Sequence, residues 1–235
     1  MTTPSTARRL TLEAVVIIAS ILAAFAIDTW WDGRQEDRRQ EALLRAIASD
    51  VRGMQDEGAR VRGLWLQALD ATEKVLAAGE SRLTSADAPR VDSILRDLVL
   101  TPTFDAPTGA LDALLRSDLG EVQSSSLVQS TTRLRAHIAD LEREQQYLDT
   151  AAIEAWQYLA TLGIDIPSLG LSWSTGRPNP VERKLSPGWS QIGDPTLRAS
   201  VYTEWIYLTN CLGVLDSIES ELGALETELA TRLDS

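Results

Sequence analysis

The hydrophobic pattern of this chain changes once, from a continuous apolar stretch to long amphipathic stretches. The apolar stretch covers residues 10–27 and contains one ionisable side chain, Glu13. At 1.5 Å of rise per residue it would extend about 27 Å as a helix, close to the hydrocarbon thickness of a bilayer. Trp30 and Trp31 follow it, where aromatic side chains anchor helices at the membrane surface. We therefore expect a transmembrane helix over residues 10–29.

Flanking charges favour an N-terminus in the cytoplasm. Arg8 and Arg9 precede the apolar stretch, whereas the arginines after it are mixed with carboxylates. The more positive flank stays cytoplasmic, so we expect residues 1–9 to form a short cytoplasmic tail and residues 30–235 an external helical domain. The alternative is a cleaved signal peptide, because Ala24-Phe25-Ala26 resembles a cleavage site. The length of the apolar stretch favours a retained anchor.

Small side chains gather on one side of the expected anchor. They are Ala19, Ser20, Ala23 and Ala24, which form two pairs at a spacing of four residues. Bulky residues lie largely on the other side. Small residues let a second helix approach closely, so this pattern predicts that the anchor packs against another transmembrane helix.

Apolar residues recur every three or four positions through most of the remaining chain, which is typical of helices. We expect the anchor helix to continue to about residue 57 and a second helix to reach about residue 79, with Gly53, Gly58 and Gly63 kinking or breaking this stretch. Short helices are opened by Asp87-Ala88-Pro89, with Val91, Ile94, Leu95 and Leu98 inward, and by Asp105-Ala106-Pro107, with Leu111, Leu114 and Leu115 inward.

Two long helices complete the expected pattern. The first is capped by 124–126, ends at Gly163, and has a heptad seam of Leu127, Thr131, Leu134, Ile138, Leu141, Gln145, Leu148, Ala152, Ala155, Leu159 and Leu162. The second starts at Asp194-Pro195, and its inward residues are Trp205, Leu208, Leu212, Leu215, Ile218, Leu222, Leu225 and Leu229, with a shift of phase near Ile218. Each would be about 55–60 Å long. No segment alternates as a strand would. The sequence therefore predicts an all-α protein, an elongated antiparallel bundle or coiled-coil hairpin behind one transmembrane helix.

The connection between these two helices, residues 164–194, is rich in proline and glycine and has no helical period. Structureless segments of this length are uncommon in compact domains and are usually functional or disordered. This one carries aromatic, apolar and basic residues that suit a docking surface, namely Leu171, Trp173, Arg177 and Trp189. The alternative is that it folds back and covers its own bundle.

Composition argues against several classes of function. The chain has 235 residues and a net charge of −12, which disfavours nucleic acid as a partner. Cys211 and His137 are the only residues of their types, so a Cys/His zinc site and a disulfide framework are excluded. Phosphate-binding glycine loops and hydrolase motifs are absent from the sequence. We expect no catalytic residues, no metal and no cofactor, and interpret Cys211 as a small core residue.

Several short motifs together resemble a family of uncharacterised bacterial single-span membrane proteins, a domain of unknown function. They are Glu13 in the apolar stretch, Trp30-Trp31 at its end, an Arg/Glu-rich helix, and the central pattern Phe104-x-x-Pro107, Ala110, Leu114, Ser117, Leu119 and Val122. The resemblance covers about residues 8–160. Where the family is usually Asn-rich around one Trp, this chain has Asp28-Thr29-Trp30-Trp31-Asp32. The resemblance implies an anchored helical layout in the bacterial inner membrane and brings no catalytic residues with it.

These observations favour a non-catalytic, membrane-anchored accessory or scaffolding subunit of a larger membrane complex, for example a photosynthetic or respiratory one. Its partners would be other membrane subunits and the lipid bilayer, with the external domain in the periplasm. One alternative is a ligand-sensing periplasmic bundle, although the nine residues before the span leave no room for a cytoplasmic output domain. Another is a coiled-coil spacer that forms homo-oligomers through its heptad seam.

Overall fold

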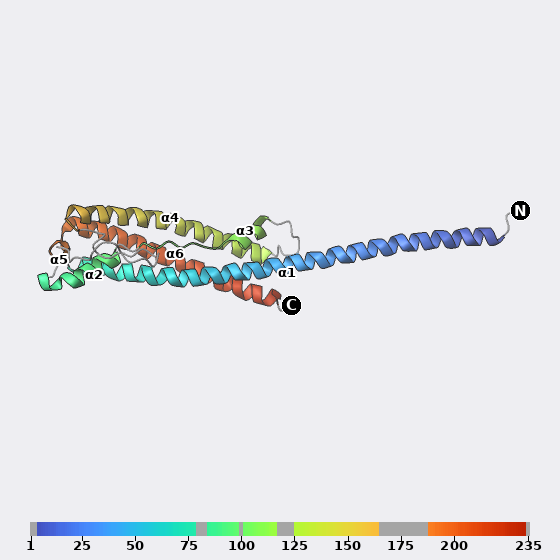
Figure 1. The fold of residues 1–235 in the computed structure, drawn as a ribbon, viewed down its shortest axis with the longest axis horizontal. Helices are drawn as coiled ribbons and strands as arrows, with labels where there is room; N and C mark the ends of the chain where they lie inside the picture. The colour runs from blue at the N-terminus through green and yellow to red at the C-terminus, as the bar shows by residue number, and fades with distance from the viewer. Residues whose placement is uncertain (1–3, 79–83, 99–100, 117–124, 165–187, 234–235) are drawn as a thin grey trace, which may run out of the picture.

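The computed structural model describes residues 4–78, 84–98, 101–116, 125–164 and 188–233, and every regular element in them is helical. The elements, in chain order, are α1 (Pro4–Ala78), a 3-10 turn η1 (Ser85–Asp87), α2 (Ala88–Leu98), α3 (Gly109–Arg116), α4 (Ser125–Thr161), α5 (Gly188–Gln191) and α6 (Pro195–Leu233). Figure 1 shows α1 as a long rod. The other helices pack along its C-terminal part, away from the N-terminus of the chain. The expected all-α class and the elongated antiparallel bundle are confirmed.

Helix α1 is one continuous helix of 75 residues, about 110 Å long. The break expected near residue 57 is wrong. Gly53 and Gly58 instead lie where other elements press against the helix. A Cβ atom at Gly53 would come within 3.0 Å of Pro107 Cγ, and one at Gly58 within 3.6 Å of Leu215 Cδ1. These glycines therefore serve close packing, and the flanking helix-forming residues keep the backbone helical.

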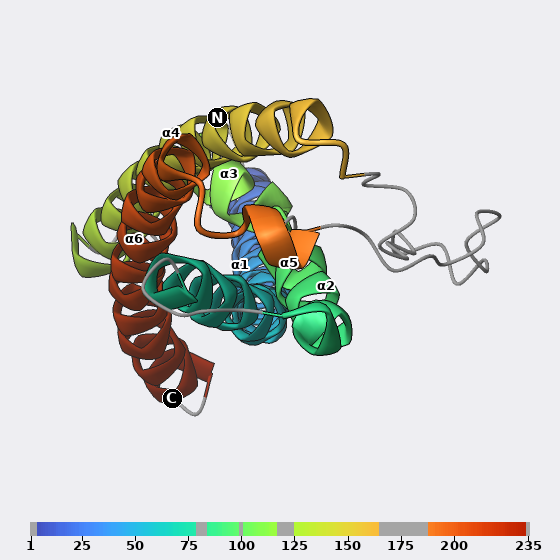
Figure 2. The ribbon, with the colours of Figure 1, turned by 90° about the vertical axis from the view of Figure 1, so that its left-hand side faces the viewer.

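The three long helices form an arc in which α6 lies between α1 and α4 (Figures 1 and 2). Helix α6 runs antiparallel to both neighbours, as the chain directions in Figure 1 show. In the described residues the backbones of α1 and α4 do not approach each other within 8 Å. The fourth side of the bundle is therefore left for the elements between α1 and α4.

The core of α6 follows a regular alternation of four- and three-residue steps. Its buried residues are Leu197, Val201, Glu204, Leu208, Cys211, Leu215, Ile218, Leu222, Leu225 and Leu229. The expected phase shift near Ile218 is therefore absent. Trp205 and Leu212, expected to point inward, are only partly buried, and Glu204 and Cys211 occupy the core positions beside them. The reason is that α6 is packed on two sides, so a constant heptad register outweighs the preference of each single side chain.

The seam of α4 agrees with its expectation. Of its eleven residues, all but the last, Leu162, are buried, including the polar Thr131 and Gln145. Helix α4 ends with Gly163 at a φ of 78°, where Gly163 N donates to Ala160 O and Ile164 N donates to Leu159 O, both near 3 Å. This left-handed glycine cap is the one that the sequence predicts.

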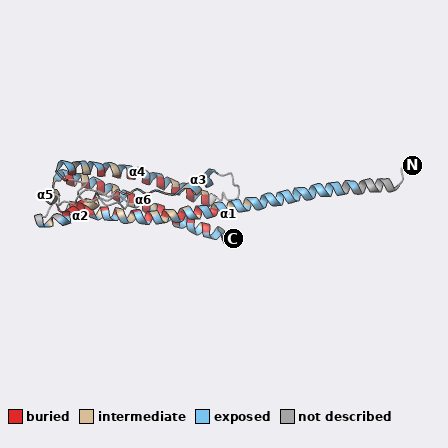
Figure 3. Ribbon diagram, viewed as in Figure 1, coloured by how far each residue is buried: buried red, intermediate tan, exposed pale blue. Residues whose placement is uncertain are grey.

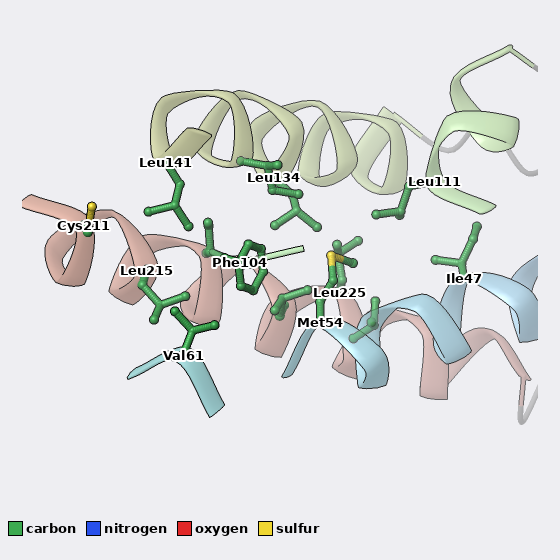
Figure 4. Packing of buried hydrophobic residues seen from close by; sticks show 14 of the residues in the cluster. Ile47, Met54, Val61, Phe104, Leu111, Leu134, Leu141, Cys211, Leu215 and Leu225 are labelled. Atoms are coloured by element: carbon green, nitrogen blue, oxygen red, sulfur yellow. The ribbon is translucent and has the colours of Figure 1, made fainter. Parts of the chain in front are cut away.

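Helix α2, the extended residues 101–108 and α3 together fill the fourth side of the bundle (Figure 2). The α2 residues expected inward are buried, as are Leu111 and Leu114 of α3, whereas Leu115 is 40% exposed. That last expectation is wrong because α3 is only eight residues long and covers the core with a single narrow stripe. Phe104 projects from the extended segment into the core between the long helices (Figure 4) and is 5% exposed.

Side chains of α1 hold the extended segment in place. Trp65 Nε1 donates to Pro102 O at 3.0 Å, and Arg60 donates to Thr103 O at 3.1 Å. Asp50 Oδ2 accepts a 2.7 Å bond from Ala110 N and so caps α3 from a neighbouring helix. The segment lacks helical hydrogen bonds of its own, and these contacts satisfy part of its backbone.

Candidate functional site

The N-terminal part of α1 stands alone. One helix in the described residues is long and apolar enough to cross a membrane, it lies at the N-terminal part of α1, and none of the residues in its apolar window is buried (Figure 3). A core helix of similar composition would be covered by other elements. Large apolar side chains here are open to the surroundings, with Ile17, Leu22 and Phe25 between 59% and 66% exposed. The exposed apolar surface is therefore suited to contact lipid.

The predicted helix-packing face of the anchor is fully exposed. Ala19, Ser20, Ala23 and Ala24 lie on α1 with no described part of the chain over them. Ser20 Oγ donates to Val16 O at 2.8 Å, so the one polar group on this face is satisfied within the helix. None of the described helices packs there, and the packing itself stays a prediction.

A polar stalk separates the apolar stretch from the bundle. From Asp28 to Ala42 the helix packs against no core residue, and the first core contacts are those of Leu43 and Leu44. At 1.5 Å per residue this stalk is about 22 Å long. The core of the bundle therefore begins beyond the stalk on the same unbroken helix, and only the C-terminal end of α6 reaches back beside Arg34 and Arg38.

The start of the stalk carries the predicted interface anchors. Trp30 and Trp31 are 58% and 61% exposed, and their ring centroids lie 6.4 Å apart. The guanidinium of Arg34 lies over the Trp30 ring at 5.2 Å from its centroid. These residues, with Gln35 and Arg38, surround an open hollow of about 200 Å³.

The predicted docking residues of the long connection cannot be placed. Leu171, Trp173 and Arg177 lie outside the residues that the structure describes. Trp189 belongs to the short helix α5, which packs against α2, but its side chain is outside the described part as well. Docking through this connection therefore stays a prediction.

A groove that sequence reasoning missed runs between the extended residues 101–108 and α4. Its volume is about 550 Å³, and its lining includes Phe104, Pro107, Arg135, Glu142, Gln146 and Asp149. The groove exists because an extended segment is thinner than a helix, so the fourth side of the bundle is incomplete at this level. The sequence signal for this non-helical segment was Pro102 and Pro107, which lie near its two ends. The residue before a proline disfavours the helical backbone conformation.

Polar groups border this groove. Arg135 forms an ion pair with Asp112 at 3.2 Å. Gln145 is 7% exposed, and its Nε2 atom has no hydrogen-bond partner among the described residues. Burial raises the pKa of Asp149, and a hydrogen bond with Thr101 partly offsets this effect. The groove offers amide and carboxyl groups beside an apolar floor, which suits a peptide surface.

One carboxyl group lies in the core without a partner. Glu204 is 0% exposed, and neither of its carboxylate oxygens has a hydrogen-bond partner among the described residues. Burial raises its pKa to about 8, so the group is mainly protonated at neutral pH. Contacts between α6 and α4, such as that of Tyr207 with Tyr147, place it at about the level of Ala151.

The described residues hold no group of three or more side chains that could ligate a metal ion. Cys211 is buried, and burial together with the charges of Glu144 and Asp149 raises the pKa of its thiol to about 12. The thiolate that would act as a nucleophile is thus scarce at neutral pH. This geometry fits the interpretation of Cys211 as a core residue.

Comparison with known proteins finds no matching family model, no matching curated protein and no matching solved structure. The resemblance to the single-span membrane family therefore stays a prediction that rests on the short motifs themselves.

Proposed function

We propose that this protein is a non-catalytic, membrane-anchored scaffolding subunit of a larger membrane complex. The observation that carries the proposal is the continuity of α1, which enters the apolar stretch and the bundle as one helix. A helix without a break transmits orientation as well as position. A partner bound to the bundle would therefore be held at a fixed height and angle relative to the membrane.

The location follows from the same helix. The exposed apolar window supports a single-pass anchor, and the charges before it support a cytoplasmic N-terminus with a periplasmic bundle. The inner membrane of a bacterium is the location that the family resemblance implies. A photosynthetic or respiratory complex is an example of a host assembly.

Partner contact is best supported at the groove between residues 101–108 and α4. The heptad seams of α1, α4 and α6 are buried within one chain, so they offer no free surface for a coiled-coil partner. This argues against the self-associating spacer. The groove, by contrast, combines exposed polar groups with an apolar floor and lies on the rigid part of the molecule.

A photo-crosslinking experiment tests this function. A photoreactive amino acid replaces Gln146, which lines the groove, and in a matched control it replaces Gln157, an exposed residue of α4 outside the groove. Adducts with other membrane proteins at position 146, and few at position 157, support the scaffolding role. Adducts with the protein itself alone would favour the spacer, and a thermal shift with a small molecule would favour the sensing bundle.

Rigidity has its own test. A flexible glycine–serine insertion after Gly33 would uncouple the bundle from the anchor while leaving both folded, because a Cβ atom at Gly33 would meet no other element within 4 Å. If orientation matters, assembly with the crosslinked partners falls in the insertion variant, although the protein stays in the membrane. Unchanged assembly would contradict the proposal that α1 acts as a rigid support.

A further inference from the structure

We propose that the first turns of the stalk form a binding site for the phosphate headgroups of anionic phospholipids, built by Arg34 and Arg38 beside Trp30 and Trp31. This inference rests on the proposed membrane anchoring and adds the chemical class of lipid that the anchor selects. It concerns the hollow of about 200 Å³ at the start of the stalk.

Three of the five carboxylates between Asp28 and Glu41 lie on a different stripe of the helix from the arginines of the hollow. Asp28, Asp32 and Glu36 follow one another at steps of four residues and so share one stripe of the helix. Arg34 and Arg38 have the same spacing from Trp30, and this places them on a different stripe. The hollow between the two tryptophans and the two arginines is completed by Gln35 and has no carboxylate in its lining. Asp37 and Glu41, three residues after Arg34 and Arg38, line a different hollow, so an anion inside this one meets no carboxylate in its lining.

The two arginines of the hollow are available for a ligand. Within the described residues, Arg34 and Arg38 form no ion pair, whereas Arg39 pairs with Glu36 at 3.8 Å and Arg45 pairs with Glu41 at 2.6 Å. The Arg34 guanidinium contacts the Trp30 ring, which leaves its N–H groups open to a ligand. Guanidinium groups bind phosphate oxygens through paired hydrogen bonds, so two unpaired ones on the same face suit a phosphate group.

Arg34 also lies near the height of lipid headgroups, with Arg38 one helical turn farther from the membrane. Arg34 is about 10 Å along the helix axis from Ile27, the last residue of the apolar stretch. Side chains on a helix lean toward its N-terminus, which here is the membrane side. The position of the Arg34 guanidinium over Trp30, four residues earlier, shows this lean directly. The Arg34 guanidinium is thus directed back to the layer in which lipid phosphates lie.

A second hollow near the first one fits an anion less well. It has a volume of about 740 Å³ between the stalk and the C-terminal end of α6, and it shares Arg34 and Arg38 with the first. Asp37 and Glu41 also line it, and its third arginine, Arg232, is paired with Glu228 at 3.0 Å. The smaller hollow is therefore the phosphate site.

Spin-labelled lipids measure this selectivity on the full-length protein. The protein is reconstituted in phosphatidylcholine vesicles that contain trace spin-labelled phosphatidylglycerol or phosphatidylcholine, and the motionally restricted fraction gives the relative association constant. We expect wild-type protein to prefer phosphatidylglycerol by about fivefold or more, from the usual contribution of a basic residue near an anionic surface. The double variant Arg34→Gln/Arg38→Gln should lower the preference to near unity.

The matched control is Arg39→Gln/Arg45→Gln, which removes the same charge from α1 at two paired arginines farther from the apolar stretch. It should keep the preference of the wild type. An equal loss in both double variants, or no preference in the wild type, would overturn the site. Resistance to alkaline carbonate extraction tests the anchor separately, because both variants keep the apolar stretch. A wild-type protein that carbonate releases would contradict the anchor itself.

Discussion

Replacement of Glu204 by glutamine should make the bundle more stable at neutral pH and remove most of the pH dependence of its stability. The carboxyl group is fully buried without a partner among the described residues, and burial raises its pKa to about 8 from the ordinary value of 4.5. Glutamine has nearly the same shape and carries no proton that titrates in this range. The substitution therefore isolates the ionisation of the group from its packing.

The direction of the effect follows from proton binding. A raised pKa means that the folded state holds the proton more tightly than the unfolded chain. The stability that this proton provides is fully present below about pH 4.5, is lost as the pH rises, and is gone above about pH 8. With these two values, wild-type protein should lose about 3 kcal/mol of unfolding free energy between low pH and pH 7.

Chemical denaturation of the full-length protein in a nonionic detergent, followed by circular dichroism at several pH values from 5 to 8, measures this loss. The curves of wild type and Glu204→Gln should converge near pH 5 and separate toward pH 8. Glu154→Gln, at an exposed carboxyl on α4, is the control and should follow the wild type. A wild-type curve that is flat over this range, or a glutamine variant that keeps the full slope, would refute the reasoning.

Three further outcomes can be measured on the same preparation. Gly63→Ala should raise the unfolding free energy by up to about 1 kcal/mol, because the added Cβ would meet no other side chain or element within 4 Å. Gly53→Ala should gain less stability or lose some, because its Cβ would lie 3.0 Å from the Pro107 ring, and equal gains would contradict the close approach at Gly53. Cys211 should resist alkylation by iodoacetamide at pH 7.5 in the folded protein and react once the bundle is unfolded, and rapid labelling of the native state would show that the thiol is accessible. Asp50→Ala should lower the unfolding free energy by about 1 kcal/mol through loss of the bond to Ala110 N, while Asp50→Asn, which keeps an acceptor oxygen, should lose less.

The ends and seams of the helices were largely predictable from local sequence. Gly163 ends α4 in a left-handed conformation, and Asp194 Oδ1 accepts bonds from Leu197 N at 3.0 Å and Thr196 N at 2.8 Å at the start of α6. These backbone bonds lower the pKa of Asp194, with a contribution from Tyr158. Such caps depend on two or three neighbouring residues, so sequence alone determines them.

The apolar anchor was also predictable from local sequence. Its length and composition are properties of consecutive residues, and they predict a membrane span without any knowledge of the partner helices. The seam of α4 was likewise readable, because its apolar positions keep one period over its whole length.

Tertiary packing decided the remaining features. Sequence reasoning placed Trp205 inward, but the core position belongs to Glu204, since both neighbours of α6 impose one register on it. Helix propensity also predicted a break in α1 at its glycines, but the helix is continuous. Gly53 and Gly58 instead leave space for Pro107 and Leu215, which are distant in sequence. The groove beside α4 arises from two parts of the chain, the extended segment and α4, that meet only in the folded protein. Local sequence thus determined where helices form and end. Which side chains share a space depended on the close packing of segments far apart along the chain, and that packing exists only in three dimensions.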